Sequence, residues 1–140
     1  NELCRSLIMD WSELQTFADE PLCTIGAHTV HHYELAKLTQ QRARTEILES
    51  LRTLEMQLGQ RPRHLSYPIG SRAAANTREY MLAKELGLSS AVTTLPGGLY
   101  RRHAEMPWAL PRISLNGHFQ SVRYMSLFAT GALFSLVGRT

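Results

Sequence analysis

The residues best suited to chemistry in this sequence are three histidines in the stretch TIGAHTVHH, residues 24–32. His28, His31 and His32 fall within five positions, directly after a short run of apolar and β-branched residues. A neutral imidazole is the commonest protein ligand for a transition metal, and a histidine is costly to bury without a partner. The cluster therefore raises two explanations, a metal site or a set of hydrogen-bonded loop histidines.

Strands and helices are expected to alternate around this cluster. Apolar and β-branched runs predict strands in residues 22–29, 63–70, 89–94 and 109–117. Between and around them, helical periodicity and capping residues predict helices in residues 9–20, 38–62 and 76–88. Their signals are a capping box at Asp10 and Glu13, N-caps at Thr39 and Asn76, and a terminating glycine at Gly59.

The order strand, helix, strand, helix, strand is typical of a parallel α/β sheet. Ligand sites in such sheets lie at the carboxyl ends of the strands. The segments GAHTVHH, YPIG and TTLPGG all follow predicted strands, so we expect them to converge at one edge of the sheet.

Composition excludes several other classes of protein. A chain of 140 residues with 44% apolar content is about one domain, and no CxxC pair indicates a thiolate metal site. The net charge of +3 is spread along the chain, so nucleic acid is not an expected partner. The apolar stretch at residues 121–138 is interrupted by Arg123 and hydroxyl residues, so a transmembrane segment is not expected. We expect a helix packed on the core, with a helix on a membrane surface as the alternative. Nothing in the sequence indicates the oligomeric state or the cellular compartment.

Four elements in order resemble one known family: TIGAHTVHHYELAKL, LSYPIG, AVTTLPGGL and LPRISLNG. They are similar to the polysaccharide deacetylases, the NodB-homology domains of carbohydrate esterase family 4. The resemblance implies an α/β fold, a partial and irregular (β/α) barrel with parallel strands whose N-terminal strand or strands are missing. Residues 1–140 are accordingly expected to form a single, incomplete deacetylase-like domain.

The resemblance assigns the histidine cluster to a metal. In the family the first and last histidines of the element bind a divalent ion, usually zinc, and these positions fall on His28 and His32. Residues four apart on a helical turn lie on one face, which makes the pairing physically sensible. Thr29 could hold the loop through its hydroxyl group, whereas His31 matches nothing in the pattern and is expected to be a surface or packed histidine.

The YPIG segment corresponds to a family motif that lines the substrate groove. The resemblance makes Tyr67 and Pro68 substrate-binding candidates and makes the backbone N–H of Ile69 a donor to the oxyanion. Ile69 replaces the usual aromatic residue, which weakens contact with a sugar ring. Where many members have an arginine that braces the catalytic base, this chain has Ser66, and either Arg63 or Arg72 could substitute.

The remaining candidates lie toward the C-terminus. The family often takes a histidine general acid from a Leu-x-His motif, which is absent here, so His103 and His118 are the candidates, with an exposed loop histidine as the alternative for each. Arg112 matches a position that is typically arginine and is a substrate-binding candidate, or else a surface charge at a strand edge.

The resemblance implies metal-dependent hydrolysis of N-acetyl or O-acetyl groups on a polysaccharide or oligosaccharide substrate, which places the enzyme among hydrolases of non-peptide carbon–nitrogen bonds. The family motif that carries the catalytic aspartate pair is not found, since the only aspartates are Asp10 and Asp19. We therefore expect this chain alone to be inactive. The alternative is a non-catalytic carbohydrate-binding or metal-binding module of the same fold.

Overall fold

The computed structural model describes residues 7–115, 117 and 120–131. Ordered along the chain, its elements are α2 (Trp11–Ala18), η1 (Leu35–Lys37), α3 (Gln40–Leu58), β1 (His64–Ser66), α4 (Thr77–Glu85), β2 (Ser90–Pro96), η2 (Arg101–Ala104), η3 (Pro107–Ala109), β3 (Leu110–Arg112) and α5 (Val122–Ala129). The predicted alternation of strands and helices is confirmed.

The strands form one parallel sheet in the order β1-β2-β3, with Leu65 opposite Ala91 and Val92 opposite Leu110. The strand predicted at residues 22–29 is reduced to a single parallel bridge between Ala27 and Leu65. Its neighbour Gly26 lies against β1, where a Cβ atom would be 3.3 Å from the His64 carbonyl oxygen. This close approach lets residues 24–27 run beside β1, although they make only one bridge.

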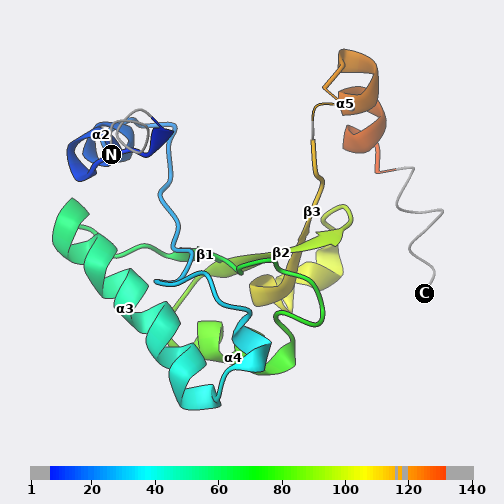
Figure 1. Cartoon of the computed structure of the whole chain (residues 1–140). Coiled ribbons are helices and arrows are strands. Elements are labelled where there is room, and N and C mark those ends of the chain that lie inside the picture. The colour runs from blue at the N-terminus through cyan, green and yellow to red at the C-terminus, as the bar shows by residue number, and fades with distance from the viewer. Residues whose placement is uncertain (1–6, 116, 118–119, 132–140) are drawn as a thin grey trace.

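Helices α3 and α4 lie on the same side of the sheet (Figure 1). Ile47 and Leu51 of α3 and Leu82 of α4 pack with Leu65 and Ala91 of the sheet to form the buried core. Burying each of these larger side chains stabilises the fold by about 1.5–3 kcal/mol. The core therefore fixes the sheet, and with it the loops that leave the strand ends.

Helix α3 begins and ends where the sequence predicts. The Thr39 side chain accepts a hydrogen bond from the Arg42 backbone N–H, and Gly59 ends the helix in the left-handed conformation at φ 69°. The predicted capping box of α2 is also present, because Asp10 and Glu13 bond reciprocally. These ends depend on residues three or four positions apart, which is why the sequence alone locates them.

Helix α5 does not pack on the core, and this prediction was wrong. It stands beyond the sheet, none of its residues is buried, and Val122 is 83% exposed (Figure 1). The core already occupies the face covered by α3 and α4. Gly131 adopts φ 67°, a left-handed conformation that ends the helix early, and residues 132–138 lie outside the described part of the chain.

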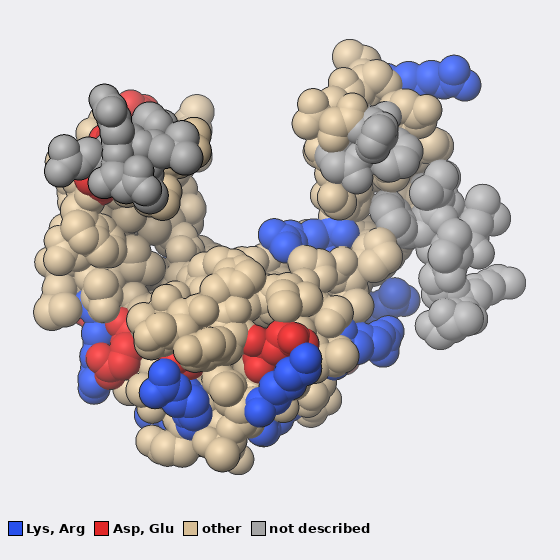
Figure 2. Space-filling view, viewed as in Figure 1, with Lys and Arg blue, Asp and Glu red and all other residues tan. Residues whose placement is uncertain are grey.

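Charged side chains gather over α3 and α4 in the view of Figure 2, whereas the hollow between α2 and α5 is lined mainly by other residues. The sheet residues His64, Ser66 and Ser90 alternate with the buried Leu65 and Ala91 and are only half-buried. Within the described residues, no helix is both long and apolar enough to cross a membrane.

Candidate functional site

Two loops meet at the carboxyl end of β1, as the alternation of strands and helices predicts. His28 follows the Ala27 bridge, and its Nδ1 atom lies 2.6 Å from the carbonyl oxygen of Ser66, the last residue of β1. Because a carbonyl oxygen can only accept a hydrogen bond, Nδ1 is the donor, and in the neutral form of the ring the lone pair is then on Nε2. A histidine that donates one ring N–H to a carbonyl in this way is oriented to bind a metal through the other nitrogen.

The His32 ring lies against the His28 ring, with centroids 4.8 Å apart and planes at 72°. A tight loop rather than a helical turn brings the rings together, because Thr29 and His32 adopt positive φ angles of 64° and 58°. The Thr29 hydroxyl accepts a hydrogen bond from the His32 backbone N–H at 3.2 Å. The expected role of Thr29 in holding the loop is confirmed, whereas the helical geometry inferred from the spacing was wrong.

His31 points to a different partner. Its backbone N–H donates to Glu46 Oε2 at 3.0 Å, its Nδ1 lies 2.9 Å from Glu46 Oε1, and its ring stacks on Tyr33. The side chain is 51% exposed, so the expectation of a surface or packed histidine is confirmed. Glu46 was missed from the sequence, although one signal was available: it is a charged residue on the apolar face of α3, beside Ile47.

The YPIG segment forms the second loop. The side chains of Tyr67 and Pro68 are buried, and the Tyr67 hydroxyl donates to the Trp108 carbonyl oxygen at 2.9 Å. Burial raises the pKa of Tyr67 well above its ordinary value, so the hydroxyl stays protonated as a donor. Both side chains contribute to the packing of the loop, and their assignment as substrate-binding residues stays a prediction.

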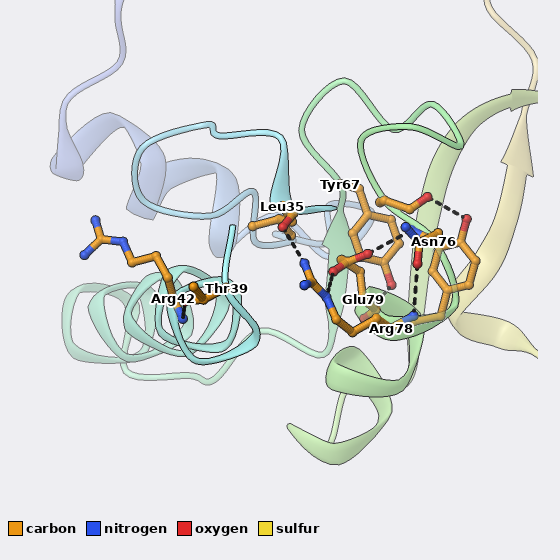
Figure 3. A network of polar contacts seen from close by, with 9 residues as sticks. Leu35, Thr39, Arg42, Tyr67, Asn76, Arg78 and Glu79 are labelled. Carbon is orange, nitrogen blue, oxygen red and sulfur yellow. Dashed lines mark hydrogen bonds and ion pairs between the residues drawn. The ribbon is translucent and has the colours of Figure 1, made fainter. Parts of the chain in front are cut away.

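A network beneath this loop ties it to the helices (Figure 3). The buried Glu79 carboxylate accepts from the Asn76 backbone N–H at 3.0 Å and from the Arg78 guanidinium. Arg78 also donates to the Leu35 carbonyl oxygen at 2.7 Å. The Tyr67 hydroxyl also lies 3.5 Å from the Glu79 backbone carbonyl oxygen, so the network joins η1, the start of α4 and Tyr67.

Ile69 sits at the top of the loop in a strained conformation. Its φ is 61°, and the Gly70 N–H donates to the Pro68 carbonyl oxygen at 2.6 Å, which closes a γ-turn of the rarer, positive-φ type. A β-branched residue in such a conformation costs about 1–3 kcal/mol. The Ile69 carbonyl oxygen accepts from the Thr94 hydroxyl at 2.6 Å, and Ile69 is 49% exposed. The turn is held firmly while the residue remains accessible, and the role of its N–H as oxyanion donor stays a prediction.

Gly70 is required by its surroundings. It adopts φ 65°, and a Cβ atom at this position would lie 2.7 Å from the Thr94 backbone nitrogen. The Gly70 carbonyl oxygen also accepts from the Thr94 N–H at 3.0 Å. The loop is thereby fixed to β2 at the carboxyl end of the sheet.

Arg112 lies at the carboxyl end of β3. Its Nε donates to the Thr93 carbonyl oxygen at 2.8 Å, and it lines a cleft of about 240 Å³ with Thr94, Ile113 and Ser114. The cleft adjoins the YPIG loop because Thr94 binds Ile69. Arg112 is thus at the carboxyl end of the sheet, near the YPIG loop, and substrate binding by it stays a prediction.

His103, one of the two general-acid candidates, makes no hydrogen bond to the His28 or Ile69 loop among the described residues. Its Nδ1 accepts from the Tyr100 backbone N–H at 2.8 Å in η2. His118 lies outside the described residues. The assignment of a general acid stays a prediction.

Arg63 lies at the wrong end of the sheet to brace a catalytic base. It precedes β1, and its Nε donates to Ser89 Oγ at 3.0 Å, just before β2. That suggestion was therefore wrong, because a strand separates Arg63 from the carboxyl-end loops. Arg72 follows the YPIG loop in sequence and remains the candidate.

The aspartates are also distant from the histidine pair. Asp10 caps α2, while Asp19 accepts from Gln15 at 2.9 Å and lines a separate cleft of about 240 Å³ with Arg63 and His64, at the amino end of β1. Within the part of the chain that the structure describes, no group of three or more His, Cys, Asp or Glu side chains could hold a metal ion. Among the described residues the His28–His32 pair therefore has no third side chain of this kind beside it, and metal binding by the pair stays a prediction.

Comparison with known sequences decides the family. The sequence model of the polysaccharide deacetylase family matches residues 4–91. This chain belongs to the polysaccharide deacetylase family. YxkH of Bacillus subtilis (strain 168), whose name describes it as a polysaccharide deacetylase, is 31% identical over 86 residues, covering 57% of this chain and 30% of YxkH.

Solved deacetylase structures share the fold. The deacetylase PplD of Streptococcus pyogenes, solved in complex with acetate, superposes with a TM-score of 0.76 at 22% identity, over 93% of this chain and 54% of PplD. The polysaccharide deacetylase BC0361 of Bacillus cereus gives a TM-score of 0.72 at 21% identity, over 85% of this chain and 36% of BC0361. The expected fold, a partial (β/α) barrel with parallel strands, is confirmed, and the chain spans between a third and about half of these relatives.

Proposed function

We propose that this chain carries the metal-binding histidines and the oxyanion-binding loop of a hydrolase that removes N-acetyl groups from a polysaccharide or oligosaccharide. The observation that carries the proposal is the His28–His32 pair, with ring centroids 4.8 Å apart and His28 oriented by the Ser66 carbonyl oxygen. Membership of the deacetylase family supports the substrate class.

The residues present fit a divalent ion such as Zn²⁺. His28 offers Nε2 as a neutral imidazole, and His32 faces it from the same loop, so these two residues would hold the ion. A divalent metal supplies Lewis acidity toward the acetyl carbonyl and lowers the pKa of water. The Ile69 backbone N–H, on a strained and accessible turn, would donate a hydrogen bond to the developing oxyanion.

A catalytic zinc site normally has three protein ligands, and the chemistry also requires a general base. Asp10 and Asp19 are used in and beside α2, away from the histidine pair. We infer that the third ligand and the base are supplied by residues outside this sequence. On that basis the 140-residue chain alone does not deacetylate its substrate.

An acetate-release assay tests the proposal. A chitooligosaccharide and an O-acetylated xylan are incubated with Zn²⁺ or Co²⁺ and either this chain or a longer protein that includes upstream sequence. We expect acetate only from the longer protein and only from the chitooligosaccharide, with loss of turnover in its His28→Ala and His32→Ala variants. Release by this chain at the rate of the longer protein would overturn the inference about missing carboxylates, and release from xylan alone would move the activity to O-acetyl esters.

The second candidate is a non-catalytic carbohydrate-binding or metal-binding module. It is favoured by the finding that the histidine pair has no third ligand among the described residues. The same assay separates the two functions, because a module would bind the chitooligosaccharide or Zn²⁺ in the longer protein without releasing acetate.

A further inference from the structure

Glu46 is a buried carboxylate that the deacetylase site described above does not use. It lies on α3 beside Ile47, and its side chain is only 2% exposed. An ionised carboxylate in such a place is unfavourable unless donors surround it. The groups that contact Glu46 therefore indicate what it does.

Three donors meet the Glu46 carboxylate. The His31 backbone N–H donates to Oε2 at 3.0 Å, while His31 Nδ1 and the Arg42 guanidinium each lie 2.9 Å from Oε1. Burial alone would raise the pKa of Glu46, but the hydrogen bonds from His31 and the charge of Arg42 outweigh it and hold the pKa below its usual range. Two of the three contacts come from the loop that carries the histidine pair.

The hydrogen bond from the His31 backbone N–H to Glu46 lies in the strained part of that loop. His31 lies between Thr29 and His32, which both adopt positive φ angles that non-glycine residues rarely take. Such conformations persist only where the surrounding structure fixes them. The hydrogen bond from the His31 N–H to Glu46 anchors the loop to the longest helix of the fold, one residue before His32.

We propose that Glu46 is a positioning residue that holds the 28–32 loop in the shape that brings the His28 and His32 rings together. The consequence for metal binding rests on the function proposed above, but the effect on loop shape does not. His31 contacts Glu46 through both its backbone N–H and its side chain. Removing the His31 side chain leaves the backbone hydrogen bond in place, so it should change the loop shape less than removing the Glu46 carboxylate.

The test compares two substitutions of Glu46 with two control substitutions elsewhere on α3. Glu46→Ala removes the anchor, and Glu46→Gln keeps an oxygen that can accept from the His31 N–H. Glu49→Ala is the matched control on α3, because Glu49 is a half-buried glutamate that forms an ion pair with Arg52. Ile47→Val is the stability control, because it removes one methyl group from the core next to Glu46 and leaves the Glu46 carboxylate in place.

Two measurements are made on each variant, together with its thermal midpoint. In the metal-free protein, nuclear Overhauser contacts between the His28 and His32 ring protons report the loop shape. Titration with Zn²⁺ alone reports the affinity of the site. We expect Glu46→Ala to lose the ring contacts and to bind Zn²⁺ about 10–100-fold more weakly, the range typical for residues that orient metal ligands. Glu46→Gln should retain the ring contacts in part, and Glu49→Ala and Ile47→Val should retain them fully.

The outcomes are distinct. Unchanged ring contacts in Glu46→Ala would overturn the positioning role, as would equal loss in Ile47→Val at a similar fall in thermal midpoint. If the wild-type protein fails to bind Zn²⁺, the metal site of the proposed function fails, and the ring contacts alone decide the role of Glu46.

Discussion

The two ends of the parallel sheet differ in where the backbone adopts left-handed conformations. At the carboxyl end, Thr29, His32 and Ile69 have positive φ angles, and they are the only non-glycine residues among those described that do. Near the amino end, such angles fall on Gly59, before β1, and Gly87, before β2, and a Cβ atom at either would meet nothing within 4 Å.

This difference distinguishes turns that only connect helices to strands from the loops that form the candidate site. A glycine adopts positive φ at little steric cost, so the amino-end turns connect helices to strands without strain. Thr29, His32 and Ile69 adopt it at a cost. Thr29 and His32 are joined by a hydrogen bond within their loop, and Ile69 is held by the Thr94 hydroxyl of β2. The strained residues thus lie in two loops at the carboxyl end of the sheet, beside the facing rings of His28 and His32. Such a concentration of strain is typical of a preorganised site.

The largest expected effect is on metal affinity. His28→Ala and His32→Ala should each lower Zn²⁺ affinity by more than about 100-fold, because each removes a proposed ligand. His64→Ala, at the amino end, should leave the affinity unchanged, and His31→Ala should change it little, since its backbone contact to Glu46 remains. Isothermal titration calorimetry measures these values, and equal affinity in all four variants would refute the site.

The second effect concerns stability and compares glycines at the two ends. Gly70→Ala should lower the free energy of unfolding by about 3 kcal/mol, because positive φ is combined with a Cβ position 2.7 Å from the Thr94 nitrogen. Gly87→Ala should cost only about 1 kcal/mol, since its positive φ is not accompanied by any contact. Urea unfolding measures both, and similar losses would remove the distinction between the ends.

A smaller effect should appear in the pH dependence of stability. The pKa of Glu46 in the folded protein is lowered from 4.5, so its contribution is fully present above pH 4.5 and is lost as the pH falls through the folded-state pKa. Glu46→Gln should therefore weaken the loss of thermal stability on acidification below pH 4.5. Thermal midpoints measured from pH 7 to pH 3 check this, and parallel curves for Glu46→Gln and the wild type would contradict it.

The smallest effect tests the strain at Ile69. Ile69→Gly should raise the free energy of unfolding by about 0.5–1 kcal/mol, because glycine adopts φ 61° without the penalty of a β-branched side chain. The N–H at this position is retained, so turnover by the longer protein should persist. A loss of stability above 1 kcal/mol would show that the Ile69 side chain contributes packing that outweighs the strain.

The sequence by itself determined the elements whose ends depend on near neighbours, and it located the histidine pair. The capping box of α2 and the caps of α3 involve residues three or four positions apart. His28 and His32 could be selected because their spacing and the motifs after them are readable along the chain. The convergence of the two loops followed from the parallel alternation of strands and helices.

Only the tertiary structure decided how the site is held. The contacts that fix it join His28 to Ser66, His31 to Glu46 and Tyr67 to Trp108, across 38, 15 and 41 positions of sequence. Likewise, α5 shows the helical pattern of a core helix, yet none of its residues is buried. Contacts between distant residues arise from packing of the whole chain, and local patterns cannot encode which partner a buried carboxylate or a strained turn will meet.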